Sequence, residues 1–137
     1  MKHNLFYTNT FNRIDLIRTL KDDWDDDGAP AFSPNNLAKV KEFIQLYIPQ
    51  DIDTITVPEV NPCPDGSIDL DWNTWIDISG IKTEVQILIN LSFDPQYTVS
   101  YYGEIRHRPM SEVIKGTYDD ASIKNNDLVV LLSYLHN

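Results

Sequence analysis

The sequence predicts an α+β domain, in which two N-terminal helices and one C-terminal helix pack on an antiparallel sheet of four to five strands. Three observations support this prediction. Apolar residues recur at helical spacing before residue 53, alternate with polar residues from there to about residue 118, and return to helical spacing after residue 125. The 137 residues, of which 42% are apolar or aromatic, are enough to close one core, so residues 1-137 are expected to form a single domain.

Two helices are predicted before the sheet. The first, Asn12–Lys21, begins at an asparagine that can cap it, and its apolar side chains recur every three or four residues. The second, Pro34–Ile48, follows Ser33, and a hydroxyl cap followed by proline at the first helical position is a strong start signal. Pro49 is expected to end this helix, because proline cannot continue one.

Alternation of polar and apolar residues predicts the strands. The candidate strands are Thr54–Val57, Ser67–Trp72, Val85–Leu91 and Tyr97–Ile105. The third is expected to be central, because it is apolar along one side and mixed along the other. Pro64-Asp65-Gly66 is predicted to be a turn, and Asp94-Pro95-Gln96 is predicted to join the last two strands as a hairpin.

The end of the chain leaves one alternative open. Residues 106–120 fit either a short helix from Ser111 or a last strand from Val113 to Tyr118. Beyond them, Asn125 to Asp127 can cap a final helix, Asn126–His136, whose leucines form one apolar stripe.

The chain is acidic, with 21 aspartates and glutamates against 11 lysines and arginines and a formal net charge of −10. Direct binding to nucleic acid or to an anionic membrane is disfavoured, because both need basic residues to neutralise phosphate. The excess acid is typical of a soluble surface. The alternative interpretation is a partner protein with a basic surface, for example a nucleic-acid-binding protein whose site this domain blocks.

The sequence favours a cytoplasmic location. Its single cysteine, Cys63, cannot form an intrachain disulfide, which suits a reducing compartment. Residues Met1 to Tyr7 lack the apolar segment of a signal peptide, and no apolar run approaches the ~20 residues that span a bilayer.

No catalytic motif is present in the sequence, and no cofactor is expected. The chain has no phosphate-binding glycine loop, zinc-ligand spacing or Gly-x-Ser-x-Gly motif. Asp23-x-Asp25-x-Asp27-Gly28 has the spacing of the first half of a calcium-binding EF-hand loop. Pro34 stands where the closing glutamate would be, so we predict a solvated acidic loop without a tightly bound calcium ion.

Aromatic residues beside carboxylates are typical of binding hot spots as well as of cores. Trp72 continues the apolar side of its strand and is predicted to be buried. Asp69 and Asp71 share the other side, about 7 Å apart, a spacing that also fits a glycosidase carboxylate pair. The predicted binding residues are Trp24, Asp25, Asp26, Asp27, Asp69, Asp71 and Trp75.

Two segments carry a family resemblance. Leu20–Pro30 with the following Ser33-Pro34, and Pro64–Ile68 leading to Trp72, resemble a family of small uncharacterised bacterial and phage proteins. Its pattern is Trp-Asp-Gly-x-Gly-Ala-x-Pro, then Pro-Asp-Gly-x-Ile and a strand that ends in Trp. Here Asp26 replaces the first glycine and the proline comes one place early. The resemblance implies a bacterial or mobile-element setting, where small acidic proteins often act as antitoxins, immunity proteins or inhibitors.

The leading functional hypothesis is therefore a small acidic, non-enzymatic protein-interaction domain that binds a basic partner through Asp22–Asp27 and the Asp69/Asp71 strand face. The alternative is a small-molecule or glycan-binding domain, or a hydrolase, with Trp24, Asp25, Asp69 and Asp71 around a cleft. A third possibility is a structural domain whose partner is a second copy of itself. The sequence leaves the oligomeric state open.

Overall fold

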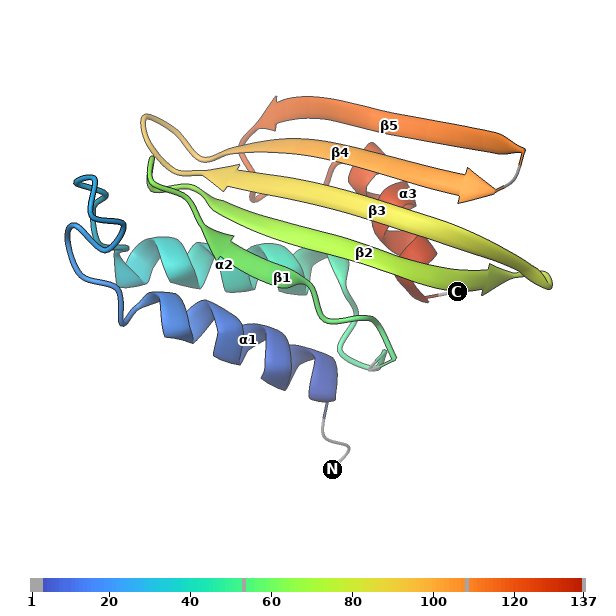
Figure 1. Cartoon of the computed structure of the whole chain (residues 1–137), viewed down its shortest axis with the longest axis horizontal. Coiled ribbons are helices and arrows are strands. Elements are labelled where there is room, and N and C mark those ends of the chain that lie inside the picture. The colour runs from blue at the N-terminus through green and yellow to red at the C-terminus, as the bar shows by residue number, and fades with distance from the viewer. Residues whose placement is uncertain (1–3, 53, 108, 137) are drawn as a thin grey trace.

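A computed structural model of the chain describes residues 4–52, 54–107 and 109–136. Within these residues two helices precede five strands, and a third helix follows them (Figure 1), which confirms the predicted α+β arrangement. The elements are α1 Leu5–Ile17, α2 Pro34–Tyr47, β1 Glu59–Pro62, β2 Ile68–Ile78, β3 Ile81–Ser92, β4 Thr98–His107, β5 Met110–Asp119, α3 Asn126–Ser133 and the 3-10 turn Tyr134–His136.

The five strands form one antiparallel sheet in the order β1-β2-β3-β4-β5, so each strand pairs with its neighbours in the chain. β3 lies at the centre, as predicted, and β1 and β5 lie at the two edges. β2 and β3 pair without a break as far as Ile78 and Ile81. The turn between them is Ser79-Gly80, with φ of 53° and 84°, and positive φ at both positions suits the twist of a two-residue hairpin.

The core lies between the helices and one face of the sheet. Alternate residues of β2, β3 and β4 are buried on this face, including the predicted core residue Trp72, and they pack against apolar residues of α1, α2 and α3. The intervening residues of the same strands are exposed or half-buried. Since strand side chains alternate between faces, the second group forms the other face of the sheet. We call it the open face, because no helix of the described chain covers it.

The C-terminal helix is held on the sheet by close packing and by side-chain hydrogen bonds. Leu131 of α3 lies directly over Gly103 of β4, where a larger residue would have no room. The Tyr101 hydroxyl donates to Asp127 Oδ2 at 2.8 Å. The Tyr47 hydroxyl of α2 accepts the Asn125 N–H at 2.7 Å, just before α3 begins. The predicted cap is confirmed, because Asn125 Oδ1 accepts the N–H groups of Asp127 and Leu128.

The predicted first helix is misplaced along the chain. The sequence predicts Asn12–Lys21, whereas α1 is Leu5–Ile17, and Asn12 lies inside it. Asn4 is the actual cap: its Oδ1 accepts the Tyr7 N–H, and its Nδ2 donates to the carbonyls of residues 50 and 52. The buried stripe therefore begins one or two turns earlier than predicted, and the residues after Ile17 form a turn.

The predicted strand Thr54–Val57 is wrong, because this segment joins no ladder and β1 begins only at Glu59. Side chains hold the segment instead. The Trp72 indole donates to the Thr56 carbonyl at 2.8 Å, and the hydroxyls of Thr56 and Thr74 lie 3.2 Å apart.

Two predicted strands are too short. The sequence predicts Ser67–Trp72 and Val85–Leu91, whereas β2 and β3 extend to Ile78 and Ile81 and meet in a hairpin that the local alternation did not reveal.

The remaining predicted elements agree closely with the structure. α2 starts at Pro34 with Ser33 Oγ accepting the Asn36 N–H, and it ends one residue before the predicted end. Residues 64 and 65 form the predicted turn. Of the two alternatives for residues 106–120, the strand is correct and becomes β5.

Candidate functional site

The open face combines exposed apolar side chains with charged ones. Four large apolar residues stand out from it, and Trp75 is the most exposed at 52%. They come from four different strands, and the paired registers place them on one side of the sheet. The four residues are Trp75, Leu88, Tyr102 and Val113.

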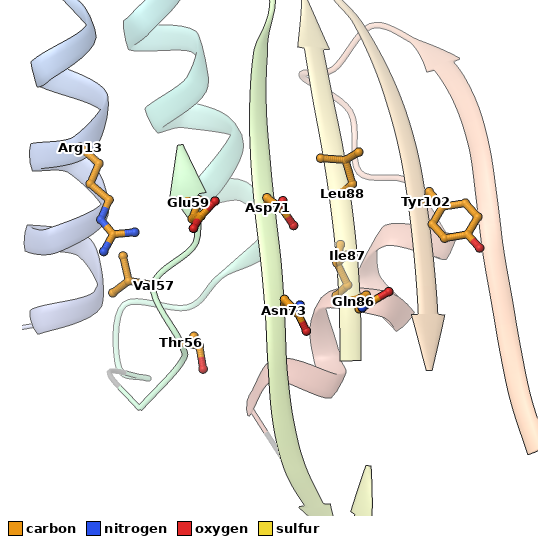
Figure 2. A pocket seen from close by; sticks show the side chains of 10 residues that line it. All are labelled: Arg13, Thr56, Val57, Glu59, Asp71, Asn73, Gln86, Ile87, Leu88 and Tyr102. Atoms are coloured by element: carbon orange, nitrogen blue, oxygen red, sulfur yellow. The ribbon is translucent and has the colours of Figure 1, made fainter. Parts of the chain in front are cut away.

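A groove with a volume of about 650 Å³ lies on the open face near the start of β1. Figure 2 shows side chains from β2, β3 and β4 along it and Arg13 of α1 at its side, pointing toward the segment of Val57 and Glu59. Arg13 Nη1 donates to the Pro58 carbonyl at 2.5 Å, which fixes that segment against α1. The other polar lining residues are Thr56, Asp71, Asn73, Gln86 and Tyr102.

Three carboxylates, Glu59, Asp69 and Asp71, form what we call the acidic cluster. Glu59 faces Asp71 across the β1–β2 pair, and Asp69 lies two residues along β2 on the same face. Glu59 and Asp71 line the groove, whereas Asp69 Oδ1 accepts a hydrogen bond of 2.8 Å from Asn90 Nδ2. Burial, followed by the charges of Glu59 and Asp69, raises the pKa of Asp71 above its usual value.

The charges of the open face are compensated unevenly. Among the described residues, no lysine or arginine lies within ion-pair distance of the acidic cluster. Farther along β3 and β4, Arg106 pairs with Glu104 at 2.9 Å and with Glu84 at 3.3 Å. Arg13 also lines the groove, where it donates to the Pro58 carbonyl, so the three carboxylates of the acidic cluster outnumber the one guanidinium. The groove end therefore has an excess of negative charge, and the other end is nearly balanced.

A smaller hollow of about 300 Å³ lies at that balanced end. Trp75 lines it together with Lys82, Arg106 and Met110. The Lys82 ammonium lies 5.2 Å from the centre of the Trp75 ring, close enough for a cation–π contact. Trp75 and Asp71 share one face of β2, about 13 Å apart along the strand.

The acidic residues before α2 lie apart from both hollows, in the loop between α1 and α2. In Figure 1 this loop is at the end of the molecule where the β1–β2 turn also lies. Trp24 is half-buried: its ring contacts Phe32 with centroids 6.0 Å apart, and its indole donates to the Pro30 carbonyl at 2.9 Å. Trp24 thus closes the loop onto the core.

The loop carboxylates bind the loop's own backbone. Asp25 Oδ1 accepts the N–H groups of Ala29 at 3.0 Å and Asp27 at 2.9 Å, and these bonds hold the pKa of Asp25 below its usual value. Asp23 Oδ1 accepts the Gly28 N–H at 2.7 Å. The side chains of Asp26 and Asp27 are exposed. The structure therefore gives two of the three EF-hand-like carboxylates a role in holding the turn.

We expect no sub-micromolar calcium affinity from this loop, because two of its carboxylates already accept backbone N–H groups and the closing ligand is missing. Within the described part of the chain, no group of three or more histidine, cysteine or acidic side chains is arranged to hold a metal ion. Calorimetric titration with calcium tests this, with Asp25→Ala as the control. Sub-micromolar binding to the natural chain that disappears in Asp25→Ala would contradict the prediction.

The predicted binding residues are therefore distributed over three places. Asp71 lines the groove with Asp69 beside it, Trp75 lines the smaller hollow, and the tryptophan and aspartates at positions 24–27 belong to the loop. Trp24 and Asp25 line neither hollow, so the cleft proposed around them together with Asp69 and Asp71 is not one of these two.

Of the residues that line the groove, sequence reasoning identified only Asp71; those it missed include Arg13, Glu59, Leu88 and Tyr102. Leu88 is visible in the sequence as an apolar residue on the polar side of an alternating strand, but a single surface apolar residue is common and does not by itself mark a contact surface. Glu59 carried no signal, because its position opposite Asp71 depends on a strand register that the sequence does not display.

No protein-family model, curated protein or solved structure matches the chain. The resemblance to bacterial and phage proteins thus stays a prediction. In the described residues, no helix has the length and apolar character needed to cross a membrane.

Proposed function

We propose that the chain is a non-enzymatic interaction domain whose open face binds a partner protein with a basic surface. The observation that supports this most directly is the acidic cluster beside the exposed side chains of Leu88 and Tyr102. An apolar contact next to an excess of one charge is the combination that protein interfaces use for affinity and for orientation.

The acidic cluster favours a cation from the partner. Glu59 and Asp71 face each other, and their repulsion together with the partial burial of Asp71 makes the fully ionised pair costly. An arginine or lysine side chain placed in the groove would relieve that repulsion. Tyr102 lines the same groove, and its ring can contact a guanidinium group. The net charge of −10 would speed the approach of such a partner.

The loop between α1 and α2 is proposed as a second, weaker contact, because Asp26 and Asp27 expose their carboxylates there. The family resemblance adds a possible setting: a bacterial or mobile-element protein that acts as an antitoxin, an immunity protein or an inhibitor. This setting depends on the resemblance alone and is independent of the groove.

Removing the two groove carboxylates is expected to weaken binding of a basic ligand about tenfold. Each carboxylate would form a charge pair with the ligand that is shielded from water, and the loss of such pairs speeds dissociation. The variant is Glu59→Gln with Asp71→Asn, and the probe is a synthetic peptide of alternating arginine and leucine, titrated by NMR. Chemical-shift changes should concentrate around Leu88 and Tyr102. The same titration of Asp26→Asn with Asp27→Asn measures the loop's contribution.

The matched control is Asp51→Asn with Asp94→Asn, which removes the same charge from two exposed positions outside the groove. We expect this control to bind the peptide with less than about a twofold loss at moderate salt. If the control and the groove variant lose affinity equally, the attraction is a general effect of net charge, and the proposed site is wrong.

A small-molecule or glycan site is the second candidate, because the groove has the volume of a small-ligand pocket. Asn73 and Gln86 provide amides beside the carboxylates and Tyr102, a set of groups that can bind sugar hydroxyls. A panel of neutral oligosaccharides in the same NMR titration separates the two functions. Saturable binding of one sugar, lost in Asp71→Asn, would favour this second candidate.

A further inference from the structure

The two edges of the sheet differ in how they are protected. β1 is only four residues long, and α1 packs against it. β5 is ten residues long, and within the described chain it pairs with β4 alone. Figure 1 shows β5 along the rim of the sheet, on the side away from α1 and α2. Natural edge strands are usually shortened, bulged, covered, broken by proline or lined with charged side chains, because their outward N–H and C=O groups can pair with another strand.

Of these protections β5 has only charged side chains, chiefly Glu112 and Lys115. Its register with β4 is continuous from Met110 to Asp119, so no bulge interrupts it, and the sequence contains no proline there. No residue of β5 is buried, although the strand includes Val113, Ile114 and Tyr118. Every second residue of such an edge turns its backbone hydrogen-bonding groups outward.

The side chains of β5 suit pairing with a second β5. Antiparallel strands related by a two-fold axis keep the two sheets continuous and place like faces together. With the axis at Ile114, Val113 of each copy faces Lys115 of the other, and Met110 faces Tyr118. Ser111 then faces Thr117 and Glu112 faces Gly116, so no two like charges are directly opposite. An axis at Lys115 would instead place two lysines opposite each other.

We propose that two copies of this chain pair through β5, antiparallel and centred on Ile114, so that their sheets join into one. The contact uses the outer edge of β5, whereas the groove lies on the open face and extends from β1 to Tyr102 of β4, the ladder partner of Lys115. Both open faces then lie on the same side of the joined sheet, and the pair presents two copies of the groove. A negative charge of −10 on each copy opposes association, so higher salt should strengthen the pair.

Sedimentation equilibrium of the full chain, at several concentrations and two salt levels, tests the proposal through the pairing of Val113 with Lys115. Val113→Lys places two lysines opposite each other at two symmetric points, and we expect it to raise the dimer dissociation constant about tenfold. Val113→Glu places a glutamate opposite lysine and should lower the constant. Val113 is 48% exposed, so both variants should keep the fold, and thermal melting checks this.

These changes in the dimer dissociation constant are opposite to those that net charge alone predicts. Val113→Lys makes the chain less negative, which by itself would favour association, and Val113→Glu makes it more negative, which would oppose association. Leu88→Lys and Leu88→Glu make the same charge changes on the open face away from β5 and should follow net charge only. Adding Lys115→Glu to Val113→Lys should restore pairing. A chain that stays monomeric throughout, or Val113 variants that follow net charge, would overturn the proposal.

Discussion

Replacing Trp72 with alanine is expected to lower the free energy of unfolding by about 4 kcal/mol, because large buried aromatic residues cost this much when truncated. Trp72 is 1% exposed and lies among the apolar side chains of the core. Its indole also donates to the Thr56 carbonyl, so the substitution releases the segment before β1. A loss of this size is a large part of the stability of a small domain. Urea denaturation followed by circular dichroism measures it.

Trp75→Ala is the matched control, since it removes the same side chain from the same strand three residues later. Trp75 is on the open face, where truncation loses mainly the contact with Lys82. We expect it to cost less than about 1 kcal/mol. Similar losses for the two variants would contradict the assignment of one face of β2 to the core and the other to solvent.

Gly103→Ala is expected to destabilise the fold by about 2 kcal/mol through overpacking beneath α3. A methyl group at this position would overlap Leu131 Cδ2 and would lie 2.8 Å from Leu131 Cδ1. Leu131 is fully buried, so it has little space into which to move. The change should therefore loosen α3 from the sheet. Hydrogen exchange of the α3 amides, together with urea denaturation, measures both effects.

The coupling between the two residues provides the control. Leu131→Ala removes the obstructing side chain, so adding Gly103→Ala to it should cost clearly less than adding Gly103→Ala to the natural chain. If the two costs simply add, the contact between Gly103 and Leu131 does not explain the role of the glycine.

The sequence predicted an element well where the residues that start or end it lie next to it in the chain. Ser33-Pro34 located the start of α2, and Asn125 located the start of α3, because each cap acts on the residues directly after it. The start of α1 was harder to predict. Asn4 and Asn12 are both possible caps, and Asn4 is fixed by carbonyls near residue 50, far away in the sequence. Thr54–Val57 has strand composition, but a side-chain contact from Trp72 decides its structure.

The candidate site was less predictable than the fold. Asp69 and Asp71 were identifiable from the alternation within one strand, and the structure places Asp71 in the groove. Its partner Glu59 is determined by the β1–β2 register, and Arg13 comes from a helix more than forty residues away in the sequence. The loop aspartates formed the most conspicuous acidic segment, yet three of them, Asp22, Asp23 and Asp25, bind backbone N–H groups. Such local use of aspartate is common in turns and resembles a binding motif in sequence.

The order of the strands in the sheet also has a consequence for how the chain reaches this structure. Each strand pairs with the one before it, and the turn at Ser79-Gly80 closes the longest ladder with two residues. The entropy lost in closing a loop rises with its length, so the sheet can grow by short closures, one hairpin at a time. The helices come from the two ends of the chain, and their docking supplies the distant contacts that complete the core. We therefore expect hairpin closure to precede docking of the helices when this chain folds.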